Sequence, residues 1–161
     1  GEHKVQGNTS GFGTGINGNL FLLNPNSCEA LISNTTGTQN IAIGTSALIY
    51  NTIGGSNTSI GVNSLVYNTS GVSNTAVGNQ ALRNNTASNN TAVGYKTLRN
   101  NTTGRYNVAA GLCALSSNTT GRNSTALGTI AMRLTTTGAY NTALGYYALG
   151  RSTTGSNNTV M

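Results

Sequence analysis

A 17-residue unit recurs along most of this chain, and it constrains the fold more than any other feature. Each unit carries Asn-Thr-Ala-Val-Gly or a variant, an apolar residue four positions after the glycine, and then Asn-Thr-Thr-Gly. The glycine of the first motif recurs at Gly44, Gly61, Gly78, Gly94, Gly111, Gly128 and Gly145. The steps are 17 residues long except for one step of 16, between Gly78 and Gly94. A nearly constant period of this length is typical of repeat proteins, in which each unit stacks on its neighbours.

The composition of the unit favours extended backbone over helix. Glycine, threonine, asparagine and serine dominate it, and all four are poor helix formers. Branched residues alternate with a central alanine, as in a short strand, while glycine and asparagine at fixed positions supply turns. We therefore predict an all-β fold, a parallel β-solenoid (β-roll) of 17-residue coils. Each coil is expected to hold two short strands, one around Val77 and one around Leu82.

Stacking would place equivalent side chains above one another, about 4.8 Å apart, in continuous columns. We expect apolar columns inside, with asparagine and threonine ladders beside them. The first expected core column is Ile43, Ile60, Val77, Val93, Leu127 and Leu144. The second is Leu48, Leu65, Leu82, Leu98, Leu115, Met132 and Leu149.

The repeat divides the chain into two parts. Residues 1–33 depart from the pattern and are expected to form an N-terminal cap or an atypical first coil, because solenoids need protected ends. Residues 34–161 form the tandem array. The last four residues begin another copy, so we expect the array to continue in a longer parent protein or against another chain.

The interior of one such coil is thin, which favours assembly. Each unit supplies about two large apolar residues and two alanines. Several chains packed together would bury more surface per residue than one chain does. We therefore expect a homotrimer, intertwined or side by side, with a monomeric solenoid as the alternative.

Ionisable side chains are scarce, which argues against catalysis. Glu2 and Glu29 are the two acids, His3 is the single histidine, and the two cysteines lie far apart in the sequence. Paired carboxylates, a Ser-His-Asp triad and a metal-ligand cluster all need groups that this chain lacks. We expect no enzymatic activity and no cofactor or metal. The sequence also lacks an apolar run long enough to span a membrane, so we expect no membrane insertion.

The net charge of +6 is unevenly placed. Seven of the eight basic residues lie between Arg83 and Arg151, where there is no acid. Such asymmetry indicates either an anionic partner or a device for solubility. An anionic cell-surface polysaccharide could contact stacked arginines and exposed tyrosines, with these candidates: Arg83, Arg99, Arg105, Arg122, Tyr95, Tyr146 and Tyr147. Basic residues are too few, and too little patterned, for us to expect nucleic-acid binding.

The repeat also resembles known families. The segment Asn74-Thr-Ala-Val-Gly78-Asn-Gln-Ala81-Leu82 is similar to the head repeat of trimeric autotransporter adhesins of the YadA type, although the Asn-Thr-Thr-Gly corner is extra here. The full unit, as in residues 141–155, resembles arrays in phage tail-fibre proteins and related bacterial surface proteins. The resemblance covers about residues 30–161 and implies a trimeric, extracellular or virion-borne β-roll.

These observations lead to one preferred function and two alternatives. The chain is expected to be a structural segment of a phage tail fibre or surface adhesin, in a virion tail fibre or at the cell surface. An ice-binding solenoid is the first alternative, because threonine columns on a flat face could order water. The second is a subunit of a homopolymeric extracellular filament.

Overall fold

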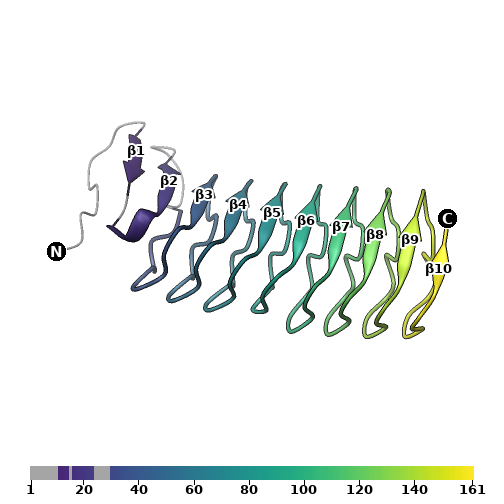
Figure 1. Cartoon of the computed structure of the whole chain (residues 1–161). Coiled ribbons are helices and arrows are strands. Elements are labelled where there is room, and N and C mark those ends of the chain that lie inside the picture. The colour runs from purple at the N-terminus through teal and green to yellow at the C-terminus, as the bar shows by residue number, and fades with distance from the viewer. Residues whose placement is uncertain (1–10, 15, 24–29) are drawn as a thin grey trace.

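The computed structural model describes residues 11–14, 16–23 and 30–161, which build one rod of stacked coils (Figure 1). It is a parallel β-solenoid of about eight coils with about 17 residues per turn, and its strands form a single sheet. The strands are β1 (Gly11–Thr14), β2 (Leu20–Leu23), β3 (Ile41–Ile43), β4 (Thr58–Ile60), β5 (Thr75–Val77), β6 (Thr91–Val93), β7 (Val108–Ala110), β8 (Thr125–Leu127), β9 (Thr142–Leu144) and β10 (Thr159–Val160). A 3-10 turn, η1 (Ile16–Gly18), lies between β1 and β2.

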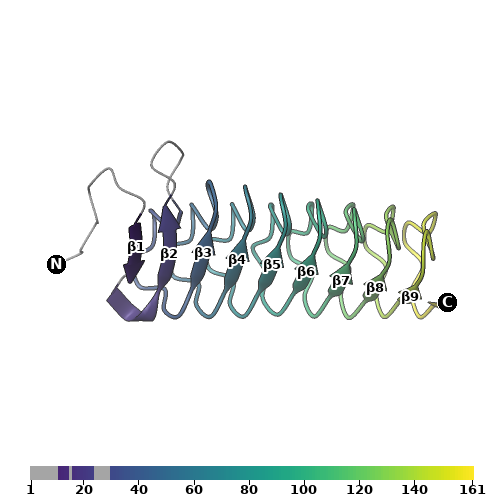
Figure 2. The ribbon, with the colours of Figure 1, turned by 90° about the horizontal axis from the view of Figure 1, so that it is seen from above.

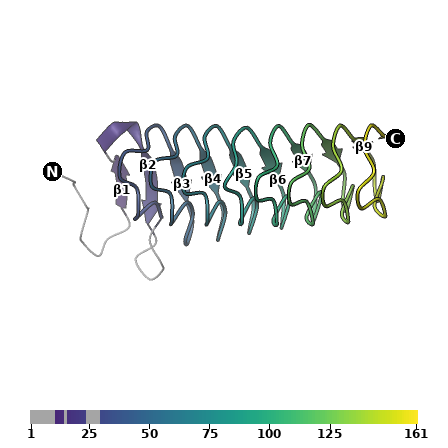
Figure 3. The same cartoon turned by 90° about the horizontal axis from the view of Figure 1, so that it is seen from below.

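The strands follow one another across the sheet in chain order. β1 and β2 pair antiparallel, and every later pairing is parallel and in register, so that Thr58 lies beside Thr75 and Ile60 beside Val77. Figure 2 shows the strands side by side along one face of the rod, and Figure 3 shows the turns that cross the opposite side. The expected cap, residues 1–33, lies partly outside the described residues, because residues 1–10, 15 and 24–29 are not among them.

The leucine column fills the interior. From Leu48 to Met132, each of its residues is completely buried. The prediction of a second strand around Leu82 is wrong, because this segment is a series of turns. Leu82 itself has φ 49°, in the left-handed region, which costs a non-glycine residue about 1–2 kcal/mol. Burial of the leucine side chain, at about 1.5–3 kcal/mol, offsets that cost.

The first expected core column, from Ile43 to Leu144, lies on the outer face of the sheet. This is contrary to our expectation that it lines the core. Val93, Leu127 and Leu144 are 42%, 37% and 49% exposed, and Ile43, Ile60 and Val77 are half-buried. In strands β3 to β9 the central residue points inward instead, as Ala76 and Ala92 do. The limited interior space explains this orientation. A second buried column, which includes Ala81, also enters the interior beside the leucines, so only small side chains fit at the centre of each strand.

Two ladders of buried asparagines hold successive coils together. In the first ladder, Asn57 donates from its backbone N and from Nδ2 to Oδ1 of Asn40, both at 3.0 Å. In the second, Asn51 donates from Nδ2 to Oδ1 of Asn34 at 2.8 Å. These amides also donate to a backbone carbonyl in the Asn-Thr-Thr-Gly turn or its equivalent, as Asn57 does to the carbonyl of Gly71 at 2.8 Å. Buried amides are tolerated here because the stacking supplies their partners.

Candidate functional site

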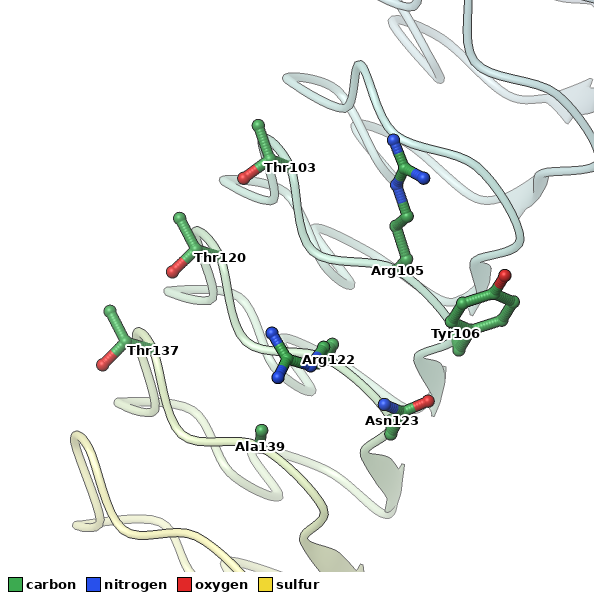
Figure 4. Close-up of a pocket in the computed structure, with 8 residues that line it drawn as sticks. All are labelled: Thr103, Arg105, Tyr106, Thr120, Arg122, Asn123, Thr137 and Ala139. Carbon is green, nitrogen blue, oxygen red and sulfur yellow. The ribbon is translucent and has the colours of Figure 1, made fainter.

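An open groove crosses three successive coils in the basic half of the rod. Its walls are three rows of equivalent residues, which Figure 4 shows running in parallel from coil to coil. The first row is Thr103, Thr120 and Thr137, the second is Arg105, Arg122 and Ala139, and the third contains Tyr106 and Asn123. The groove encloses a volume of about 640 Å³.

The corner of each coil positions these side chains. The residue after each arginine has a left-handed backbone, with φ 59° at Tyr106 and 53° at Asn123. Backbone N–H groups then join the coils in register: Asn123 donates to the carbonyl of Arg105, and Tyr140 to that of Arg122, both at 3.0 Å. This pairing places the two arginines one coil apart, about 4.8 Å at the backbone.

Aromatic rings border the two arginines. Tyr106 is 58% exposed and Tyr140 is 52% exposed. The guanidinium carbon of Arg122 lies 5.9 Å from the centroid of the Tyr140 ring, within the range of a cation–π contact. The groove therefore combines fixed positive charge, threonine hydroxyls and accessible ring faces.

Charge in the groove is not compensated by the protein. Between residues 30 and 161 the chain has no aspartate or glutamate. Like charges repel, by about 1 kcal/mol at about 4 Å in bulk water, and Figure 4 shows the side chains of Arg105 and Arg122 extending in different directions from neighbouring coils. An anion that lies between Arg105 and Arg122 would replace this repulsion with two attractions, so the site is suited to a carboxylate, sulfate or phosphate group.

The other expected arginines lie elsewhere. Arg83 and Arg99 share a column after the core leucine and are half-buried against the coil surface. The guanidinium carbon of Arg83 lies 5.1 Å from the Tyr67 ring centroid, and its Nη1 donates to Oδ1 of Asn84 at 3.2 Å. These contacts leave Arg83 less available to a ligand than Arg105 and Arg122, which are exposed.

The expected tyrosines are also outside the groove. Lys96 Nζ lies 4.8 Å from the centroid of the Tyr95 ring, and the Tyr146 and Tyr147 rings contact each other at 6.4 Å. Sequence reasoning missed the groove's own aromatic residue, Tyr106. The position of this tyrosine directly after Arg105, at the Asn-Thr-Thr-Gly corner, was the signal that could have found it.

The described residues include no group of three or more side chains that could hold a metal ion. No helix among them is both long and apolar enough to cross a membrane. No protein-family model matches the chain, and neither the curated proteins nor the solved structures contain a significant match to it.

Proposed function

We propose that this chain is a structural segment of a phage tail fibre or a bacterial surface adhesin, and that it binds an anionic host-surface glycan along the groove. The solenoid supplies a stiff rod, because each coil is bonded to the next through the sheet and most coils are also joined by the asparagine ladders. One observation carries the binding proposal: Arg105 and Arg122 are stacked and exposed in a groove, in a region without a single acid.

A polysaccharide suits this groove better than a small anion does. Its charged groups repeat along a chain, and the two arginines of the groove follow one another in successive coils of the rod. Exposed Tyr106 offers a ring face for a sugar, and the hydroxyls of Thr103 and Thr120 offer hydrogen bonds. In this assembly the chain is a homotrimer on a virion tail fibre or a cell surface, and it has no catalytic role.

Binding to an acidic polysaccharide tests the proposal. Polygalacturonate is the probe, dextran is the neutral control, and affinity is measured by biolayer interferometry. Arg105→Gln/Arg122→Gln is expected to weaken binding by at least about tenfold, since each charge-assisted hydrogen bond contributes about 1.5–3 kcal/mol. Rising salt should weaken the wild type as well.

Arg83→Gln/Arg99→Gln is the matched control, because it removes the same charge from a different column. This variant should retain most of the affinity. Equal losses from the two double variants would show that net charge rather than the groove binds the polysaccharide. No measurable binding by the wild type would remove polygalacturonate-type glycans from the proposal and leave the structural role.

Ice binding is a second candidate function, favoured by one observation. An unbroken threonine column runs the length of the array: Thr35, Thr52, Thr69, Thr86, Thr102, Thr119, Thr136 and Thr153. Many of its hydroxyls donate to the carbonyl of the next coil, as Thr52 Oγ1 does to Thr69 at 2.9 Å, which fixes their orientation. Thermal hysteresis at millimolar protein measures this activity, and its absence would exclude it.

A further inference from the structure

The outer face of the sheet differs from the rest of the surface in its chemistry. Strands β3 to β9 present two outward columns there, one of threonine, isoleucine and valine, and one of isoleucine, valine, leucine and alanine. None of these positions is charged. Val93, Val108 and Leu144 are each more than 40% exposed, and the strands beneath them are paired in register. The second of these columns is therefore a continuous apolar stripe along the rod, and the first, in which five of the seven residues are threonine, runs beside it.

The stripe continues past the glycine that ends each strand. The next column along the chain is also free of charge. It mixes polar residues, Thr45, Asn79 and Thr129, with the exposed apolar or aromatic residues Val62, Tyr95, Leu112 and Tyr146. Seven strands at about 4.8 Å give the stripe a length of about 30 Å. Contiguous exposed apolar surface of this kind marks an interaction site.

We propose that this face, the outward columns of β3 to β9, is where one copy of the chain packs against a second copy. The proposal deepens the homotrimer part of the proposed function by naming the contact surface. Every basic residue of the array lies instead in the turns: Arg83, Lys96, Arg99, Arg105, Arg122, Arg133 and Arg151.

Charge explains why the partner is another copy and why it meets this face. Two copies carry like charge and repel wherever their turns approach. The outward columns of β3 to β9 hold no cation, so two copies can meet there with little repulsion. Lys96 lies at the edge of this surface, with Nζ 4.8 Å from the centroid of the Tyr95 ring. A partner with acidic groups would instead be drawn to the arginine-bearing turns, where it would find opposite charge.

Periodicity supports the same choice. Columns that repeat once per coil need a partner with the same repeat, so that each coil can make an equivalent contact. A second copy has this repeat by construction, and rotation about an axis parallel to the rod keeps all coils in register. Burial of branched residues such as Leu127 and Leu144 would then supply apolar burial that the alanine-rich interior of one chain lacks.

The oligomeric state of the full chain tests the inference. Val93→Lys/Leu127→Lys places two cations per copy on the face, and light scattering coupled to size exclusion measures the mass. We expect the wild type to be an oligomer and this variant to run as a monomer, or to dissociate at a concentration at least about tenfold higher than the wild type does. Ser70→Lys/Thr154→Lys is the matched control, because both residues are exposed in the turns; it should keep the wild-type mass.

Circular dichroism and thermal unfolding distinguish dissociation from misfolding. Should the lysine variant fail to fold, Val93→Thr/Leu127→Thr makes the same test with a milder loss of apolar surface. A wild-type monomer would overturn both this inference and the proposed homotrimer, while polygalacturonate binding would be judged separately. A wild-type oligomer that the face variants leave intact would overturn only the assignment of the face.

Discussion

From Asn51 to Asn118, each asparagine of the second ladder donates its amide to two acceptors. Asn118 donates from Nδ2 to Oδ1 of Asn101 at 2.6 Å and to the carbonyl of Gly121 at 3.0 Å. The next coil has Thr135 at this position, and the hydroxyl of Thr135 donates forward to the carbonyl of Ser152 at 2.9 Å. Oδ1 of Asn118 is therefore buried without a hydrogen-bond partner. The coil after that of Thr135 has Ser152 at this position, so the asparagine ladder ends at Asn118 and its last acceptor is unsatisfied.

Thr135→Asn should extend the ladder by one coil and stabilise the protein, with the hydroxyl of Ser152 in the next coil as the donor to the new Oδ1. The new amide can donate to Oδ1 of Asn118 and to the carbonyl of Gly138, as its equivalents do in earlier coils. A net hydrogen bond contributes about 1 kcal/mol, and the free energy of unfolding should rise by about that amount. Urea denaturation followed by circular dichroism measures the change.

Thr137→Asn is the control for that change. It makes the same substitution in the same coil, at an exposed position in the groove wall and outside the ladder. Its free energy of unfolding should stay within about 0.5 kcal/mol of the wild type, as for other surface substitutions. A Thr135→Asn protein that is no more stable than Thr137→Asn would contradict the ladder account.

At the scale of the coil, the sequence predicts the stacking but not which side of the strand faces inward. The period aligns Leu65 above Leu82, and the structure buries both. In a three-residue strand such as Thr75–Val77, alternation says only that the outer two residues share a side. Because valine is larger and more apolar than alanine, we expected Val77 to point inward. The space beside the leucines is only large enough for a side chain such as that of Ala76. The left-handed backbone at Leu82 could not be predicted either, because leucine rarely adopts this conformation.

The candidate site could be predicted only in part for a related reason. Column position correctly made Arg105 and Arg122 neighbours. It could not show that Arg83 folds onto Tyr67, because that contact depends on the side-chain conformation and on a residue in another coil.

The glycine that ends each strand gives a second test of stacking. A Cβ atom built on Gly111 would lie 2.5 Å from the carbonyl oxygen of Gly128 in the next coil, and φ there is 128°. At Gly145, φ is 121° but no atom lies within 4 Å of such a Cβ. Backbone strain is therefore shared by the two sites, whereas the collision is specific to Gly111.

Gly111→Ala is expected to lower the free energy of unfolding more than Gly145→Ala. Strain at an unfavourable φ costs of the order of 1–3 kcal/mol in both variants. The collision with backbone adds about 1–3 kcal/mol in Gly111→Ala, because the next coil cannot move without disturbing its own hydrogen bonds. Urea denaturation of both proteins gives the difference, and equal losses would argue against tight stacking at this column.

At the scale of the whole molecule, stability is a sum over coils and their interfaces. Each coil contacts the coil before it and the coil after it through strand pairing and the core column, and in most coils also through the asparagine ladders. In the described residues the core is therefore a column along the rod, with no single central site whose disruption would unfold every coil. What it requires is register, because a shifted coil would place asparagine against leucine and glycine against side chains.

Deletion of one whole coil should therefore lower the melting temperature less than deletion of half a coil. Deletion of residues 58–74 joins Asn57 to Thr75, which occupies the same column as Thr58, so every later coil stays in register. The rod should shorten by about 4.8 Å and unfold cooperatively, with the downstream groove still binding polygalacturonate. Deletion of residues 58–65 joins Asn57 to Val66 and removes fewer residues, but it leaves one coil without its strand and leucine. We expect this shorter deletion to have the lower melting temperature, measured by circular dichroism; the opposite order would mean that chain length, rather than register, governs the stability of this solenoid.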